Sequence, residues 1–235
     1  GGQATICLPL LLVMTLHPLL RSTPLIDLSH YLGGSSGRLL AKCEYVNPSL
    51  SLKDRMVRAI LESRRSDGLL PPGSSVVTAS SGNTGTSLAM HAAAMDLHAT
   101  IVVHPFCRRD SFCSDEKIRH MQAFGAEVFV ATHDDYTSLA KTHATAKGSF
   151  YLDQYNDQLN PLAYYHSLGP EIWAMTEGAI THFVMTASTG GCISGVSGCA
   201  GTWRLVMGCW LVAAAASTWK GSRRFSMAWM PIVLW

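Results

Sequence analysis

Short runs of β-branched and other apolar residues alternate along the chain with longer segments of helical period. This alternation is typical of a parallel sheet whose strands are connected by helices lying on both of its faces. The apolar runs predict strands at residues 38–44, 75–78, 98–104, 127–131, 150–152 and 182–186. The helical segments predict helices at residues 52–65 and 84–95 and another starting near Ser114. We therefore expect a three-layer α/β/α protein with sheets of the parallel type.

The helix predicted at residues 52–65 has the clearest apolar face, because Met56, Val57, Ile60 and Leu61 recur in it at helical spacing. In open α/β sheets, ligands bind at the carboxyl ends of the strands. The loops that follow predicted strands are therefore where we look for residues that carry chemistry.

The first such loop, Ser80-Ser81-Gly82-Asn83-Thr84-Gly85, follows a strand directly and opens a helix. Its hydroxyls, amide and glycines can turn a row of N–H donors toward an anion at the helix N-terminus. A capped helix with a tight turn explains the same residues equally well.

A second loop, Ser188-Thr189-Gly190-Gly191-Cys192, lies between the strand at 182–186 and a helix predicted to begin near Ile193. Its glycines allow the backbone to approach a phosphate closely. A Gly-Gly turn is weak evidence by itself.

Lys53 is predicted in the first turn of the helix at residues 52–65. The helix dipole disfavours a cation there, which favours the neutral, nucleophilic form of the amine. A solvated surface lysine is the alternative. Two anion-binding loops and one activated lysine together suggest an amino acid joined to an aldehyde that bears a phosphate.

Composition narrows the class of protein. The chain has 235 residues, of which 48% are hydrophobic and 14% are charged, enough for a sizeable core and unlike a disordered tail or a coiled coil. Lys and Arg number 18 against 16 Asp and Glu, so the net charge of +2 gives no reason to expect nucleic acid. A small neutral or anionic ligand fits better.

The seven cysteines contain no C-x-x-C and are spread through the chain, so we expect reduced thiols rather than disulfides or zinc. The ten histidines show no metal-binding spacing. We therefore expect no metal, and a location in the cytoplasm or an organelle.

Charge is distributed unevenly between the two ends of the chain. Residues 178–235 contain no acidic residue, and five of the six tryptophans fall within residues 203–235. Since a domain surface usually mixes both signs of charge, we expect residues 201–235 to form an atypical tail. Residues 1–22 form an equally atypical apolar leader, in which Pro9 and Pro18 argue against a membrane helix. The longest uncharged run of the tail, residues 205–219, is also shorter than the ~20 residues that span a bilayer.

Six motifs follow one another along the chain: N-P-S-L-S-L-K-D-R (47–55), S-S-G-N-T-G (80–85), F-G-A-E-V (124–128), L-D-Q-Y with N-P-L-A-Y-Y (152–165), G-P-E-I-W (169–173) and T-G-G-C-I-S-G-V (189–196). In this order they closely resemble the pyridoxal-phosphate enzymes of fold type II, the tryptophan synthase β-like class. Within that class they resemble cysteine synthase and cystathionine β-synthase. A-K-C-E (41–44), S-D-E-K (114–117) and D-Q-Y favour cystathionine β-synthase slightly, and G-P-E-I-W is shared with cysteine synthases.

The resemblance implies a role for each matching residue. Lys53 would bond covalently to pyridoxal 5′-phosphate and, once displaced by substrate, take the α-proton, while Asn83 would hydrogen-bond the phenolic oxygen of the cofactor. The substrate carboxylate would be held by Ser80, Ser81, Gly82, Thr84 and Gln154. The phosphate would be held by Ser188, Thr189, Gly190, Gly191 and Cys192. These roles suffice for β-elimination followed by addition of a thiol or sulfide.

The phosphate loop departs from the family pattern at two positions. Related enzymes have G-T-G-G-T, whereas Ser188 replaces the first glycine here and Cys192 replaces the last hydroxyl residue. A thiol is a weak donor, and losing a hydrogen bond to a charged group costs about 1.5–3 kcal/mol. We therefore expect cofactor affinity to be lower by one to two orders of magnitude. The partner of the pyridine nitrogen is not marked by any motif, although Ser217, Thr218, Ser222 and Ser226 offer hydroxyls.

The resemblance implies a smaller domain at residues 36–157 and a truncated larger domain formed by residues 23–35 and 158–200, with no resemblance in the tail. The expected activity is β-replacement on serine or O-activated serine, giving cystathionine or cysteine. The alternative is a truncated, inactive remnant that at most binds cofactor or a partner subunit. Expected partners are a small amino acid, a thiol or sulfide, and a second copy in a homodimer, with neither nucleic acid nor membrane.

Overall fold

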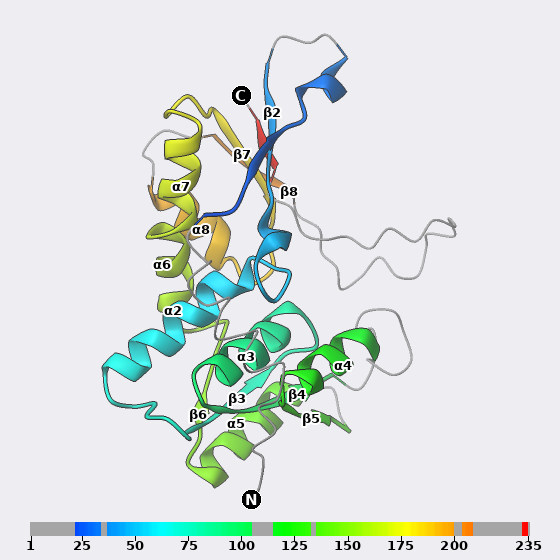
Figure 1. Cartoon of the computed structure of the whole chain (residues 1–235), viewed down its shortest axis with the longest axis vertical. Helices are drawn as coiled ribbons and strands as arrows, with labels where there is room; N and C mark the ends of the chain where they lie inside the picture. Colours follow the sequence, from blue (N-terminus) through cyan, green and yellow to red (C-terminus); the bar gives the residue numbers. More distant parts are fainter. Residues whose placement is uncertain are drawn as a thin grey trace, which may run out of the picture. The chain divides into compact units, whose positions relative to one another are not determined.

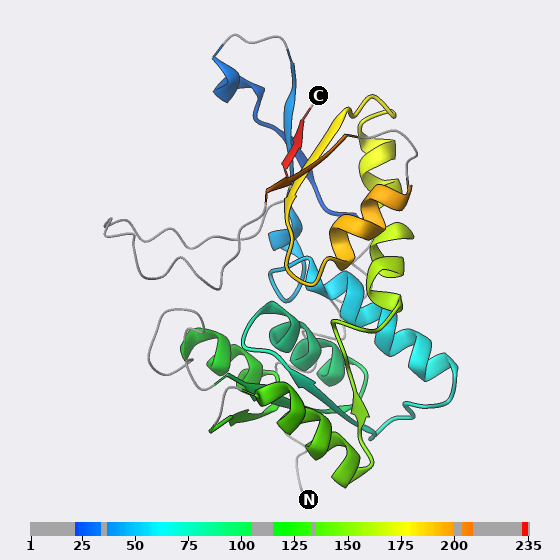
Figure 2. The same ribbon diagram turned by 180° about the vertical axis from the view of Figure 1, so that it is seen from behind.

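The computed structural model describes residues 22–33, 37–104, 115–132 and 135–199 and two strands at 204–208 and 232–234. These residues divide into two compact units, drawn in Figures 1 and 2. The first is Asn47–Leu159, and the second combines Ser22–Val46 with the described part of Asn160–Trp235. The predicted apolar leader, apart from Ser22, lies outside the described residues.

The first unit contains a four-stranded parallel sheet in the order β5-β4-β3-β6. Its strands are β3 (Ser75–Ala79), β4 (His98–Val103), β5 (Glu127–Val130) and β6 (Phe150–Tyr151). Each connection carries a helix, namely α3 (Asn83–Ala94), α4 (Asp115–Ala123) and α5 (Tyr136–Lys147). The predicted α/β class is confirmed, and the strand predictions in this unit agree with the structure within two residues.

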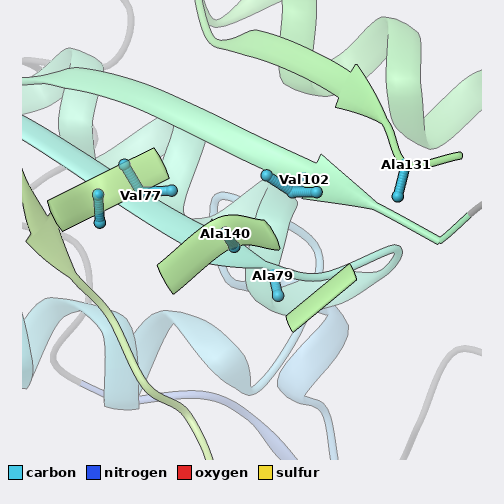
Figure 3. Packing of buried hydrophobic residues seen from close by; sticks show 6 residues of the cluster. Val77, Ala79, Val102, Ala131 and Ala140 are labelled. Carbon is cyan, nitrogen blue, oxygen red and sulfur yellow. The ribbon is translucent and has the colours of Figure 1, made fainter. Parts of the chain in front are cut away.

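Small side chains bring α5 close to one face of this sheet. Val77, Ala79 and Val102 from β3 and β4 pack with Ala140 and Ala144 of α5 (Figure 3). On the opposite face Ile101 points toward α3, which also packs against α2 (Lys53–Ser66) and α4. Helices therefore cover both faces of the sheet in this unit.

The apolar face predicted for α2 is confirmed. Met56, Val57, Ile60 and Leu61 are all fully buried. Their burial fixes the rotation of α2 about its axis. It thereby fixes the direction in which Lys53, the first residue of α2, leaves the helix.

The second unit contains a mixed five-stranded sheet in the order β1-β2-β9-β7-β8. Its strands are β1 (Leu25–Asp27), β2 (Leu39–Lys42), β7 (His182–Thr186), β8 (Arg204–Gly208) and β9 (Ile232–Leu234), with short 3-10 helices at Ser29–Leu32 and Glu44–Val46. Only β7 and β8 are parallel, so the parallel type expected for every sheet holds for the first unit alone. Antiparallel pairing needs no long crossover helix, and between β1 and β2 the structure describes the short 3-10 helix Ser29–Leu32.

Two segments of the predicted tail are strands of this sheet. Val233 in β9 is paired with Leu40 on one side and Phe183 on the other, and Leu205 in β8 is paired with Phe183. The strand at residues 39–42, predicted with the smaller domain, also pairs in this sheet. The predicted domain boundaries stay a prediction.

Three helices lie along the sheet of the second unit, α6 (Leu159–Tyr165), α7 (Leu168–Met175) and α8 (Gly191–Cys199) (Figure 2). Gly169 allows α7 and α8 to meet, since a Cβ there would lie 2.7 Å from Cys199 Cβ. None of the helices that the structure describes is long and apolar enough to cross a bilayer.

Candidate functional site

Lys53 is the first residue of α2, where the sequence placed it, and its side chain is half-buried. Its backbone N–H donates to Ser51 Oγ at 3.3 Å, so the serine satisfies one of the amides that a helix N-terminus leaves without a partner. The positive end of the helix dipole disfavours a charged ammonium at this position. The location therefore suits an amine that reacts in its neutral form.

Asp54, the next residue, anchors the start of this helix. Its buried carboxylate accepts hydrogen bonds from the Ser49 backbone N–H at 2.8 Å, from the Ser49 hydroxyl and from Ser87 Oγ at 2.5 Å. His91 Nε2 lies 3.6 Å from Oδ1. Burial alone raises the pKa of Asp54, but His91 and the two serines together hold it below its usual 3.8.

Asp54 was not singled out from the sequence. Its only signal was its place directly after Lys53 in the K-D-R motif, where it is the single acidic residue of the first turn of α2. A carboxylate on the otherwise apolar, buried face of a helix needs several donors around it. Those donors come from residues 5 to 37 positions away, so the cluster forms only in the folded unit.

The loop Ser80-Ser81-Gly82 connects β3 to α3, as the sequence predicted. Ser80 Oγ accepts from the backbone N–H groups of Gly82 at 3.3 Å and Gly85 at 3.1 Å, and Ser81 Oγ accepts from that of His104 at 2.7 Å. Hydroxyls that accept through oxygen keep their own protons to donate. The loop is therefore a preformed set of donors suited to a carboxylate.

Gly85 is required by close packing within this loop. A Cβ there would lie 2.8 Å from Met121 Cε and 3.1 Å from the Ser80 carbonyl oxygen. The glycine of the S-G-N-T-G motif thus allows α3 to start directly against the turn.

Thr84 and Gln154, which the resemblance assigns to the same substrate group, lie together. Thr84 Oγ1 donates to Gln154 Oε1 at 2.7 Å, and Gln154 Nε2 donates to the Ala79 carbonyl at 3.2 Å. Both side chains are buried at the carboxyl end of β3. The structure thus brings Ser80, Ser81, Gly82, Thr84 and Gln154 to the same end of the sheet.

Asn83 opens α3 and contacts a residue that the sequence reasoning did not assign to the site. Lys117 Nζ, on α4, donates to Asn83 Oδ1 at 3.0 Å. Lys117 belongs to the S-D-E-K motif, whose role the sequence alone did not reveal.

The loop Ser188-Thr189-Gly190 connects β7 to α8 in the second unit, again as predicted. Gly190 has a φ of +80°, a conformation that favours glycine. A Cβ at Gly191 would overlap the buried amide of Asn160, whose Nδ2 donates to Thr189 Oγ1 at 3.1 Å. The packing of Asn160 therefore requires glycine at position 191, whereas a Cβ on Gly190 would meet no described atom within 4 Å, so the backbone at Gly190 is open to a phosphate.

The two residues that depart from the family pattern differ in exposure. Ser188 is exposed, whereas the side chain of Cys192 is buried. A thiol is a weak donor, so the hydroxyls of Ser188 and Thr189 and the backbone N–H groups are the stronger donors of the loop. Each unit, taken by itself, holds residues that fit pyridoxal 5′-phosphate: the first has an amine and a loop of hydrogen-bond donors, and the second has a glycine turn that opens a helix.

Some predicted residues lie outside the described ranges, namely Ser217, Thr218, Ser222 and Ser226 as candidates for the pyridine nitrogen and the thiols Cys7, Cys107, Cys113 and Cys209. Within the described part of the chain, no three His, Cys, Asp or Glu side chains are grouped as they would be around a metal ion.

Comparisons with known proteins identify the family. The family model described as "Pyridoxal-phosphate dependent enzyme" matches residues 16–214. This range extends past Val196 and includes β8, a strand of the predicted tail.

Two curated relatives are similar in sequence to this chain. The chain is 39% identical over 181 residues to cysteine synthase B of Pseudomonas aeruginosa, covering 75% of this chain and 58% of that protein. It is 38% identical over 184 residues to cystathionine beta-synthase of Apis mellifera, covering 74% of this chain and 35% of that protein. The chain thus spans a little more than half the length of the first relative and about a third of the length of the second.

The crystal structure of O-ureido-L-serine synthase is also similar, with a TM-score of 0.71 and 25% identity over 83% of this chain and 61% of that one. The lysine at the start of α2, the two loops after β3 and β7, and the family match over residues 16–214 lead to one conclusion. The chain belongs to the family of pyridoxal-phosphate-dependent enzymes.

Proposed function

We propose that the protein to which this chain belongs catalyses β-replacement on serine or an O-activated serine, giving cysteine or cystathionine. The observation that carries the proposal is Lys53 at the start of α2, in the same unit as the donor loop at Ser80–Thr84 and Gln154. Cysteine synthase B, cystathionine beta-synthase and, at 32% identity, an O-acetylserine dependent cystathionine beta-synthase of Bacillus subtilis are relatives whose names fit this chemistry.

Each residue then has a defined task. Lys53 holds the cofactor and takes the α-proton, and the hydroxyls of Ser80 and Ser81 donate to the substrate carboxylate. The thiol or sulfide forms a new bond to the β-carbon, and the bond from that carbon to the hydroxyl or acyloxy group breaks with its electron pair. The proton of the thiol leaves with the displaced group, and Lys53 returns its proton to the α-carbon, which completes the product amino acid. When bound, the cofactor supplies an electron sink for the negative charge at the α-carbon.

The proposal is tested by identifying the lysine that binds the cofactor. The protein is incubated with pyridoxal 5′-phosphate, reduced with borohydride and digested, and the labelled peptide is sequenced by mass spectrometry. We expect the label on Lys53 and none in Lys53→Arg. A label on Lys42 or Lys117 would contradict the proposal.

A second assay then separates turnover from binding alone. Protein loaded with pyridoxal 5′-phosphate, but not treated with borohydride, is supplied with acetylserine and sulfide, or with serine and homocysteine, and cysteine and cystathionine are measured. Cofactor bound at Lys53 without either product favours the alternative, an inactive chain that binds cofactor only. That alternative was inferred from the atypical tail, and Ser188 and Cys192, which we expect to weaken the phosphate loop, would act in the same direction.

The partners and the location that the sequence led us to expect stay predictions. They are a small amino acid, a thiol or sulfide, and a second copy in a homodimer, in the cytoplasm or an organelle.

A further inference from the structure

Lys117 is placed where its charge is unfavourable unless it has a specific partner. It lies in the first turn of α4 and its ammonium is 3.9 Å from where a Cβ on Gly82, the residue before α3, would lie. Both helix N-termini carry partial positive charge, which disfavours a cation beside them. The half-buried side chain nevertheless reaches the Asn83 amide and donates to Oδ1 at 3.0 Å.

This contact determines which way the Asn83 amide faces. An ammonium has only donors, so the end of the amide that meets Lys117 must be its oxygen. The NH2 end then points away from Lys117. In that orientation Asn83 can offer a hydrogen bond to a ligand but cannot accept one through the same oxygen without competing with Lys117.

The positive charge also strengthens the donor at the other end of the amide. A hydrogen bond accepted by the oxygen polarises the group, and linked hydrogen bonds reinforce one another in a partly buried site. An oxygen that carries negative charge is the ligand atom that gains most from such a donor.

We propose that Lys117 is a positioning residue, which holds the Asn83 amide so that its NH2 group faces the phenolic oxygen of the cofactor. The inference rests on the proposed function, since it takes from it the role of Asn83. Lys117 itself needs no contact with the cofactor.

The test measures cofactor binding rather than turnover. Pyridoxal 5′-phosphate is titrated into the parent protein, Lys117→Met, Lys117→Arg and the control Arg119→Met, which removes a charge from an exposed position of the same helix. We expect Lys117→Met to bind about tenfold more weakly and to shift the absorption maximum of the bound cofactor. Lys117→Arg, which keeps a cationic donor, should restore much of the affinity and much of the parent absorption maximum. Arg119→Met should match the parent in both measurements.

A double-mutant cycle then shows whether Lys117 acts through Asn83. In an Asn83→Ala background, Lys117→Met should cause no further loss, because the amide that it orients is gone. An equal loss in both backgrounds, or parent-like binding by Lys117→Met, would overturn the inference. Far-UV circular dichroism during urea unfolding identifies any variant that is not folded. If Lys117→Met is not folded, the cofactor affinity of Lys117→Arg in the two backgrounds is compared instead.

The parent protein separates this inference from the proposed function. If the parent attaches no cofactor at Lys53, the proposed function fails, and the inference that depends on it fails as well. If the parent attaches cofactor at Lys53 and the Lys117 variants do not differ from it, only the inference fails.

Discussion

The carboxylate of Asp54 accepts a hydrogen bond from the Ser87 hydroxyl at 2.5 Å, which connects the helix that begins with Lys53 to the helix that begins with Asn83. The same carboxylate holds Ser49 in the loop that precedes Lys53. One buried group therefore sets the positions of two elements that carry predicted site residues.

Asp54→Asn should lower the free energy of unfolding at pH 7 by about 1.5–3 kcal/mol, the usual contribution of hydrogen bonds to a charged group. The amide keeps the size of the side chain but loses the charge and turns one donor toward the serines. Urea unfolding followed by far-UV circular dichroism measures the difference. Asp67→Asn, at the exposed end of the same helix, is the matched control and should change stability by less than about 1 kcal/mol.

The effect of Asp54→Asn should also depend on pH. The pKa of Asp54 in the folded protein lies below its usual 3.8, so its stabilising contribution is complete above about pH 4 and is lost as the pH falls through the lowered value. Unfolding curves of parent and variant should therefore converge in acid. A difference that stays constant down to pH 2 would show that Asp54 does not contribute through its charge.

The spacing of apolar residues predicted most helices and strands of the first unit, because this periodicity depends only on residues that are close in sequence. Residues 52–65 show this, since the apolar face expected there is the face that is buried. The loops after β3 and β7 were found for a similar reason, as each connects a strand to a helix.

The rest depended on contacts between residues far apart in sequence. Nothing local marks Ile232–Leu234 as a strand between β2 and β7, and its pairing is set by partners about 50 and 190 residues away. A-K-C-E and G-P-E-I-W were recognised only as motifs, yet Lys42 of the first and Glu171 of the second form one buried ion pair. A polar residue gives no sequence signal of being buried until its partner is known.

Lys42 should be essential for the stability of the second unit. Its fully buried ammonium donates to Glu171 and to Thr23 Oγ1 at 2.5 Å, and Thr23 in turn donates to buried Glu44 at 2.6 Å. Lys42→Met removes the cation paired with Glu171 and the donor that holds Thr23, which should destabilise by about 3–5 kcal/mol.

Tryptophan fluorescence can follow this change, because all six tryptophans lie at or after Trp173 in the second unit. Replacing both partners in Lys42→Met/Glu171→Gln should recover part of the loss, since the charge that Lys42 compensated on Glu171 is also removed. Arg38→Met, which breaks an exposed pair with Asp27, is the control and should cost less than about 1 kcal/mol. If Lys42→Met were no worse than Arg38→Met, the buried pair would contribute nothing.

Two glycines of α8 should respond in opposite directions to the same substitution. A Cβ on Gly195 would overlap the carbonyl oxygen of Pro161 and lie 3.0 Å from Tyr164 Cβ, so Gly195→Ala must push α8 away from α6. Overpacking of this kind costs about 1–3 kcal/mol. At exposed Gly198 the nearest atom is Tyr165 Cδ2 at 3.4 Å, so Gly198→Ala should instead stabilise by about 0.4–1 kcal/mol by restricting the unfolded chain.

Urea unfolding monitored by tryptophan fluorescence should move the midpoint down for Gly195→Ala and up for Gly198→Ala. Because α8 starts at the phosphate loop, Gly195→Ala should also weaken cofactor binding, which titration with pyridoxal 5′-phosphate measures. Equal midpoints for the two variants would mean that α8 does not pack on Asn160–Tyr164 as the structure shows. A lowered midpoint with unchanged cofactor affinity would mean that the loop at Ser188–Gly191 keeps its geometry independently of the helix behind it.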